Sequence, residues 1–362
     1  MRSSFWPVLG IVLGAWLAAV PGRAADDRCG TFSIVACDTT TGEVGVAVQS
    51  RVFGVGPRVA WVRGGIGAIA TQAQSNESFG PRGLDLLAAG LSAGETLEWL
   101  VAHDTLAARR QLGVVDARGS VAHWTGPECL FWAGDSSGGG FTCQGNILVG
   151  PDVVAAMVGA FEGAAGRELA DRLIAALEAG QAAGGDSRGR QSAAVLVGRP
   201  HPEFPEYAHR YVDIRVDDHA TPIAELRRLY DMYAAQGLVQ AHSRFADYLA
   251  RIGDEPGAQR ERTRIADVLR RLLAQNVEEA GTLNALAWYA ATHDLYLSDA
   301  LIAAQRAVAL EPENSNILDT LAEVHFRRGE IGQAIAVAER ALALSPDDPY
   351  LQGQLARFRG AR

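Results

Sequence analysis

The spacing of apolar residues divides the chain into a mixed part and a helical part. Between positions 31 and 216, short runs of β-branched and apolar residues alternate with turn residues such as Gly64-Gly65, a pattern typical of strands joined in hairpins. The predicted strands lie at 31–37, 43–50, 59–63, 66–73, 111–116, 120–124, 129–133, 141–148, 191–197 and 211–216. Helices are predicted where apolar residues recur three and four positions apart, at 84–91, 97–101, 153–161, 169–179 and 222–233.

The order of these elements indicates a fold class. A group of strands is followed by a helix pair, the alternation repeats, and a last pair of strands precedes a single helix. Two antiparallel sheets packed face to face, with helix pairs on both outer faces, satisfy this order with short connections. We therefore expect an α+β domain at 31–234, built as a four-layer αββα sandwich.

From about position 234 the pattern is helical throughout, and it repeats. The segment Ala304–Pro312 (AQRAVALEP) returns at Ala338–Pro346 as AERALALSP. A period near 34 residues that ends in proline resembles the tetratricopeptide repeat. The resemblance implies an all-α tail at 238–362, made of stacked helix pairs on which a protein partner docks.

The first residues have the composition of a targeting signal. Arg2 precedes an apolar run from Trp6 to Val20, and Gly22-Arg23-Ala24 puts small residues at the two positions that a signal peptidase reads. The run is shorter than the roughly 20 residues that span a bilayer. We expect a signal peptide at 1–24 and a mature chain exported to the periplasm or the medium, without a membrane span. A retained N-terminal anchor is the alternative.

Export changes the meaning of the four cysteines, Cys29, Cys37, Cys129 and Cys143. In an oxidising compartment they allow three fully paired connectivities. Cys129 and Cys143 flank a glycine-rich turn and would face each other across a hairpin, but four buried thiols fit the sequence equally well. Neither the cysteines nor the histidines have metal-binding spacing, and we expect no metal and no cofactor.

The charge of the chain excludes one class of partner. Its formal net charge is −9, whereas nucleic-acid binding requires clustered positive charge. The sequence contains no lysine, so arginine supplies every permanent side-chain cation.

Thr31 stands at the start of the first predicted strand. Ahead of an αββα order, it resembles the nucleophile of the N-terminal-nucleophile (Ntn) hydrolases, in which a Thr, Ser or Cys begins the first strand and its own α-amine is the general base. Such an amine has an unperturbed pKa of about 7.7–8.0, near the working pH. The resemblance implies amide hydrolysis by Thr31, provided that the chain is cut between Gly30 and Thr31.

The neighbouring residues resemble proteasome-type β-subunits in part. Gly30-Thr31 resembles their processing junction, and Ser50-Arg51 falls on a matching Ser-Arg pair. The catalytic aspartate of that family falls on Gln49, and its lysine has no counterpart here. Only Arg58 or Arg63 lies in the corresponding region. Arginine can hold an oxyanion, but its pKa is too high for a general base.

Two later segments resemble the support of the amine. Asp186 to Gly189 matches an Asp-x-x-Ser element, with the aspartate kept as Asp186 and glycine in place of the serine. Gln144-Gly145-Asn146 occupies the place of a second supporting loop. The resemblance implies that Asp186 and Asn146 orient the amine of Thr31.

Residues 31 to about 230 also resemble a bacterial family of unknown function that has the Ntn-hydrolase fold. The likeness rests on the motifs TFSIVA, ATQAQSN, FGPRGLDLLAAGLSAGE, QGNILVG and GGDSRGRQSAA. The residues expected to bind substrate are Arg51, Gln72, Ser75, Asn76, Arg188 and Gln191. The alternative roles are closing turns, for Ser75 and Asn76, and a solvated ion-pair cluster, for Arg188.

The sequence thus supports an exported Ntn-type amidohydrolase, acting on an unidentified small-molecule or peptide amide through Thr31. A catalytically silent binding domain, whose repeat tail docks a partner protein, is the alternative from another class. A third possibility places the nucleophile at Cys29. The mature N-terminus discriminates among them, because Ala25 to Gly30 would block the amine of Thr31.

Overall fold

The computed structural model describes residues 30–274 and 278–361. The predicted signal peptide and Cys29 lie outside these residues. Within them, the strands form a six-stranded sheet in the order β10-β9-β2-β1-β8-β7 and a four-stranded sheet in the order β3-β4-β5-β6. Neighbouring strands are antiparallel. The strands are β1 (Thr31–Asp38), β2 (Glu43–Ser50), β3 (Ala60–Arg63), β4 (Gly67–Ala73), β5 (Arg110–Asp116), β6 (Val121–Thr125), β7 (Trp132–Gly138), β8 (Phe141–Leu148), β9 (Ser192–Gly198) and β10 (Arg210–Val216).

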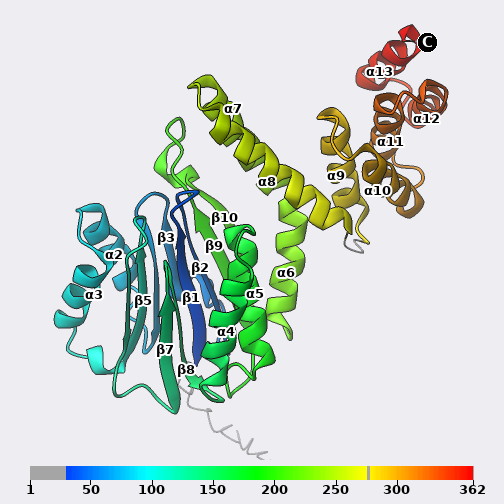
Figure 1. Ribbon diagram of the computed structural model, residues 1–362. Coiled ribbons are helices and arrows are strands. Elements are labelled where there is room, and N and C mark those ends of the chain that lie inside the picture. Colours follow the sequence, from blue (N-terminus) through cyan, green and yellow to red (C-terminus); the bar gives the residue numbers. More distant parts are fainter. Residues whose placement is uncertain (1–29, 275–277, 362) are drawn as a thin grey trace, which may run out of the picture.

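Helices cover both outer faces of the stacked sheets (Figure 1). They are α2 (Phe79–Ala88), α3 (Ala93–Ala102), α4 (Asp152–Gly163), α5 (Leu169–Ala182) and α6 (Pro222–Tyr233). The short helix α1 (Gly56–Val59) instead contributes Val59 to the core between the sheets. Three apolar cores fill the spaces between layers. Ile69 of β4 packs under α2 and α3, Val46 and Val62 meet between the sheets, and Phe32 and Ile34 of β1 pack under α4 and α5. This is the αββα sandwich that the element order predicted.

The predicted pairings are confirmed in detail. Gly64-Gly65 joins β3 to β4, and β9 lies in the same sheet as β1. Among the strands the largest shift concerns β7, which spans Trp132–Gly138, whereas the pattern predicted a strand at 129–133. Among the helices, α2 spans Phe79–Ala88 in place of the predicted 84–91.

The cysteines do not form the predicted hairpin pair. Cys37, Cys129 and Cys143 are all free thiols. Because Gly138 pairs with Phe141 at the turn, the residue opposite Cys143 is Ser136, and Cys129 lies in the loop before β7. Burial raises the pKa of the Cys37 thiol to about 11 and also raises that of Cys143. Within the described residues, burial thus disfavours the thiolate form at Cys37 and Cys143.

Every secondary-structure element in the described part of the tail is a helix. Its helices are α7 (Val239–Arg251), α8 (Glu255–Ala274), α9 (Ala280–Thr292), α10 (Leu297–Leu310), α11 (Ser315–Arg327), α12 (Ile331–Leu344) and α13 (Pro349–Gly360). The small residues expected to permit close helix packing, Ala304, Ala307, Ala334, Ala338 and Ala341, are all buried. In the described part of the chain, no helix combines the length and apolar character needed to cross a bilayer.

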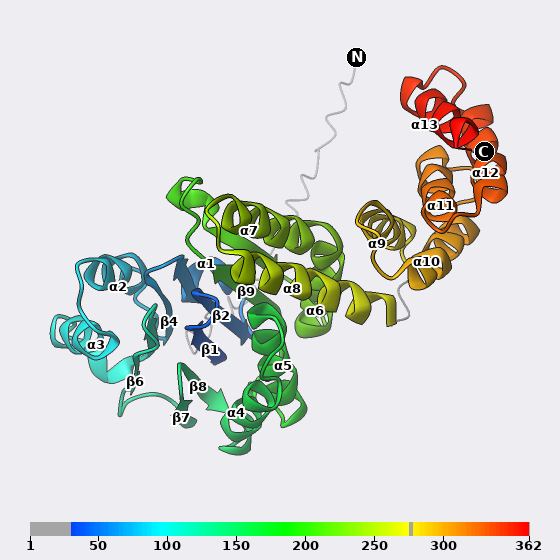
Figure 2. The ribbon, with the colours of Figure 1, turned by 45° about the horizontal axis from the view of Figure 1, so that its top comes forward.

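The predicted division at 234–238 falls inside a continuous helical segment. α6 passes through a π-helical turn, Ala234–Leu238, into α7. α7 and α8 lie together beside the sandwich, ahead of the repeats (Figure 2). The buried Val268 and Leu269 of α8 belong to the same apolar core as Phe32 of β1. The first two tail helices are therefore packed on the sandwich, although the domain bounds themselves stay a prediction.

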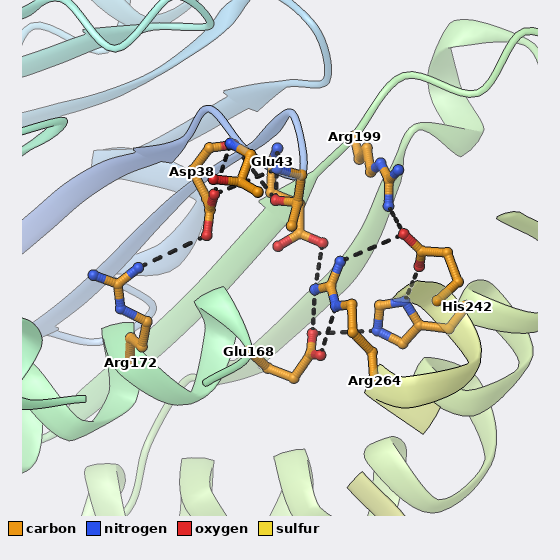
Figure 3. A network of polar contacts seen from close by, with 10 residues as sticks. Asp38, Glu43, Glu168, Arg172, Arg199, His242 and Arg264 are labelled. Atoms are coloured by element: carbon orange, nitrogen blue, oxygen red, sulfur yellow. Dashed lines mark hydrogen bonds and ion pairs between the residues drawn. The ribbon is translucent and has the colours of Figure 1, made fainter. Parts of the chain in front are cut away.

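A charged network also joins these helices to the sandwich (Figure 3). Arg264 of α8 pairs with Glu43 of β2 at 2.6 Å and with Glu168, ahead of α5, at 2.5 Å. His242 of α7 contacts Glu168 at 3.2 Å and Glu261 at 2.8 Å. Glu43 lies at the opposite end of β2 from Ser50, so this network is remote from Thr31.

Candidate active site

Thr31 is the first residue of the central strand β1. It pairs with Ser50 of β2 on one side and with Asn146 of β8 on the other. Side chains alternate along a strand, so Thr31 and Ser33 face the second sheet, while Phe32 faces the helices. The Thr31 side chain is buried, with 2% of the residue exposed.

The carbonyl group of Gly30 lies between two hydrogen-bond donors. Ser50 donates its Oγ hydrogen to the Gly30 oxygen at 2.5 Å, and Arg188 donates from Nη2 to the same oxygen at 2.8 Å. Thr31 donates from Oγ1 to Ser50 Oγ at 3.0 Å. The bond between Gly30 and Thr31 therefore has a polarised carbonyl beside a hydroxyl, which is the arrangement that attack by that hydroxyl requires.

Asp186 holds this arrangement in place. Its carboxylate accepts from the backbone N–H of Arg51 at 3.3 Å and from the N–H of Arg188 at 2.9 Å. The Arg188 guanidinium binds both carboxylate oxygens, at 3.1 Å from Nε and 2.7 Å from Nη2. A Cβ added at Gly30 would lie 2.8 Å from either Asp186 oxygen, so a larger residue at position 30 would displace this carboxylate.

A layer of buried amides lies between the sheets behind Thr31. Gln72 accepts from Ser33 at 2.7 Å and donates to Gln111 at 2.8 Å and, at 3.5 Å, to the Thr31 carbonyl. Gln111 also accepts from Asn146 at 2.9 Å. Gln144 donates to Ser33 at 2.6 Å. Because each of the three glutamines uses both ends of its amide, the layer is satisfied despite complete burial, which favours a single rigid geometry.

Sequence reasoning named Gln72, Gln144 and Asn146 but did not show that they meet in one buried layer. Gln144 and Asn146 were expected in a supporting loop, but both lie within β8, where strand pairing fixes their position. Gln111 of β5 was not identified at all, since nothing in a single strand shows which inner-face residues meet those of the other sheet. The position of Ser50, by contrast, could be predicted from the sequence. A hairpin that pairs Asp38 with Glu43 necessarily puts Ser50 opposite Thr31.

The other predicted binding residues lie further out. Arg51 donates to Gln191 at 2.9 Å on the exposed surface, and Gln191 donates in turn to Asp218 at 3.1 Å. Asn76 accepts from the N–H and the hydroxyl of Ser78, which is the turn-closing role. Ser75 precedes it in the same loop.

Two departures from the proteasome pattern are now explained. Gln49 lies opposite Phe32 and shares its face of the sheet, toward the helices and away from the Thr31 hydroxyl. Arg58 pairs with Glu77, and Arg63 with Asp85 and Glu206. The cation that contacts the Gly30 carbonyl is Arg188, which the sequence placed among the substrate-binding residues.

Backbone strain gathers at the same end of the sandwich. Ala73, Phe131 and Ile147 have positive φ angles of 69°, 54° and 54°, a region that side chains other than glycine rarely adopt. Ala73 follows Gln72, and Ile147 follows Asn146. The Ile147 N–H donates to the carbonyl of Leu130, and its own carbonyl accepts from Ser187, beside Asp186. Strain of this kind costs about 1–3 kcal/mol for each residue and is concentrated at functional sites.

Among the described residues, Asp186 and Arg188 are the charged side chains hydrogen-bonded around the Gly30–Thr31 bond. In the described ranges, no group of three or more His, Cys, Asp or Glu residues is arranged to hold a metal ion. The arrangement suits acyl transfer by a hydroxyl, with Ser50 and Arg188 as donors to an oxyanion.

Comparisons with known proteins agree with both parts of the fold. Residues 31–226 match the Family of unknown function (DUF1028), and residues 315–358 match the tetratricopeptide repeat. The first match spans more than half of the chain, which therefore belongs to the DUF1028 family. A search of curated proteins gave no significant match.

Solved structures resemble each part separately. The crystal structure of protein SPO2555 from Silicibacter pomeroyi, a DUF1028 protein, is 33% identical; the alignment covers 57% of this chain and 86% of that one, with a TM-score of 0.51. The Sgt2 tetratricopeptide domain from Aspergillus fumigatus is 16% identical over 32% of this chain and 78% of its own, with a TM-score of 0.25. The first such domain of Spaghetti (RPAP3), solved with an HSP90 peptide, is 18% identical over 33% and 94%, with a TM-score of 0.25.

Proposed function

We propose that this chain is an exported amidohydrolase of the Ntn type, with the hydroxyl of Thr31 as nucleophile after cleavage of the Gly30–Thr31 bond. The observation that carries the proposal is the pair of hydrogen bonds that Ser50 and Arg188 donate to the Gly30 carbonyl, next to the Thr31 hydroxyl. The close approach of Gly30 to Asp186 supports it, since a larger residue at position 30 would displace the carboxylate that holds Arg188.

Cleavage of the Gly30–Thr31 bond proceeds in two steps, through an ester intermediate. Thr31 Oγ1 attacks the Gly30 carbonyl carbon, the C–N bond breaks, and the hydroxyl proton goes to the released amine, which leaves an ester between Gly30 and Thr31. Water then hydrolyses the ester. The products are a carboxylate on Gly30 and a free amine on Thr31.

Substrate hydrolysis repeats this chemistry on an external amide. The amine of Thr31 takes the hydroxyl proton and delivers it to the leaving nitrogen. Ser50 and Arg188, freed from Gly30, donate to the oxyanion, and Asp186 and Asn146 orient the amine. Loss of one oxyanion donor costs about 10²–10³-fold in rate in well-studied enzymes.

The test is the mass of the protein that begins at Ala25. On incubation, the wild-type chain should lose Ala25 to Gly30 and acquire Thr31 as its first residue. Thr31→Ala should retain the segment, Thr31→Ser should cleave more slowly, and Arg188→Met should cleave about 10²-fold more slowly. Thr40→Ala, an exposed threonine at the far end of the first hairpin, is the matched control and should cleave normally.

A folded wild-type protein that keeps Ala25 to Gly30 indefinitely would refute the Thr31 mechanism. The second candidate function, a silent binding domain with a docking tail, would then take its place. One observation favours it: Thr31 is only 2% exposed and its hydroxyl is already bound to Ser50. Cleavage between Arg28 and Cys29, which would make Cys29 the first residue, is the outcome expected if that residue were the nucleophile.

A further inference from the structure

A second serine lies beside a histidine and an aspartate, away from Thr31. His123 Nδ1 lies 2.6 Å from Asp135 Oδ1, and Ser137 Oγ lies 3.5 Å from His123 Nε2. Asp135 also accepts from the hydroxyl of Thr125. The two ring nitrogens thus contact the carboxylate and the hydroxyl separately, which is the order that activates a serine in the Ser-His-Asp hydrolases.

The fold brings these residues together at the open edge of the sandwich. β6 is the last strand of one sheet and β7 the last strand of the other. Asp135 is paired with Gln144, and His123 with Gly113, whose missing side chain leaves room for Gln144. Asp135 and His123 therefore face each other across the gap between the sheets. Ser137, two residues beyond Asp135, has the same orientation.

The electrostatics suit proton transfer. Burial raises the pKa of the Asp135 carboxyl, but its hydrogen bonds with His123 and Thr125 outweigh this and lower it overall. The hydrogen bond with Asp135 raises the pKa of His123. The carboxylate thus fixes the hydrogen on Nδ1 and makes Nε2 a better base for the Ser137 hydroxyl.

The edge is open to a reactant. Ser137 is exposed, and 37% of the His123 side chain is accessible against 17% of that of Asp135. Glycines follow Ser137 at positions 138–140, and a Cβ added at Gly139 would meet no atom within 4 Å. An edge strand also leaves every second backbone N–H without a strand partner, and such a group can donate to an oxyanion.

We propose that Ser137, His123 and Asp135 form a second nucleophilic site, independent of Thr31, that hydrolyses small, unhindered esters. Ser137 Oγ attacks the ester carbonyl, and its proton moves to His123 Nε2. The acyl–oxygen bond breaks, and His123 returns the proton to the leaving alcohol. Water then attacks the acyl-serine, with His123 again as base, and releases the carboxylic acid.

A purely structural role of the His123–Asp135 pair predicts different results. If the histidine–aspartate pair only fastens the two sheet edges, changes at Asp135 alter stability, and Ser137 has no special reactivity. A reaction that reports on the serine therefore separates the two roles, because it does not depend on how firmly the edges are joined.

The experiment combines a fluorophosphonate probe with p-nitrophenyl acetate on the full chain. Labelling forms a Ser137 Oγ–phosphorus bond and releases fluoride. Peptide mapping should place the label on Ser137, and ester turnover should fall at least tenfold in Ser137→Ala and in His123→Gln. Ser136→Ala is the matched control, since Ser136 is an exposed neighbour on the other face of the same strand, and it should keep both reactions.

The label should still map to Ser137 in Thr31→Ala, so failure of the Thr31 mechanism and failure of this site are distinguishable. Circular dichroism confirms that each variant is folded. Absence of label on Ser137 in the wild type, or equal labelling and turnover in folded His123→Gln, would overturn the proposal.

Discussion

Replacement of Arg264 tests whether buried charge fastens the tail to the sandwich. Arg264 is the cation shared by Glu43, Glu168 and Glu261, at 2.6, 2.5 and 3.9 Å. Its side chain is 16% exposed, and that of Glu43 only 1%. Methionine is the informative substitution, because it keeps most of the apolar stem and removes the charge.

The expected loss follows from what the substitution leaves behind. Removing one partner of a buried ion pair strands the other charge in a poorly solvated site, at a cost of about 3–5 kcal/mol. Glu43 has no other ion-pair partner within the described residues. Arg264→Met should therefore lower the free energy of unfolding by about 3–5 kcal/mol. The matched control is Arg262→Met on the same helix. Arg262 pairs with Glu255 in the open, where such pairs contribute at most about 1 kcal/mol.

Urea unfolding followed by tryptophan fluorescence measures both values. A double-mutant cycle sharpens the result, because Glu43→Gln removes the stranded charge. The double variant Glu43→Gln with Arg264→Met should be more stable than Arg264→Met alone. If Arg264→Met costs no more than Arg262→Met, the buried network does not hold the tail, and the apolar contacts of α8 suffice.

Two further predictions concern pH and the amide layer. Burial alone would lower the pKa of His242, but the charge of Glu168 and the hydrogen bonds with Glu168 and Glu261 raise it above 6.5. The stabilisation is thus complete below pH 6.5 and is lost as pH rises through the folded-state pKa, so the melting temperature should fall more between pH 6 and 9 in the wild type than in His242→Gln; equal slopes would contradict this. Gly113→Ala puts a Cβ 2.5 Å from the Gln144 amide oxygen and should cost about 1–3 kcal/mol in urea unfolding, by overpacking. Gly159→Ala, in α4 with open space around it, should be neutral or stabilising, and an equal loss in both variants would refute the packing argument.

Local pattern was enough for the elements and their order. Alternation of side chains predicted β1 and β2, and the short polar turn between them sets a register in which Ser50 lies opposite Thr31. Helical spacing predicted the tail, and its repeating alanines predicted close helix contacts. These features depend on residues a few positions apart, where backbone geometry dictates which side chains share a face.

The contacts of the candidate site depend on how distant segments stack. Arg188 reaches the Gly30 carbonyl from 158 residues away, and Gln144 reaches Ser33 from 111 residues away. The resemblance to the Ntn hydrolases singled out Thr31 and Asp186, but no pattern within one strand shows that Gln111 of one sheet meets Asn146 of the other. The packing of α8 on the sandwich was not predicted for the same reason. An apolar face shows that a helix is covered, but not which part of the chain covers it. The sequence by itself determined the elements, the order of layers and the repeats, because these follow from local backbone geometry. Only the tertiary structure decided which polar side chains meet inside the sandwich, because that depends on the relative position of two sheets and a helix that the chain connects at long range.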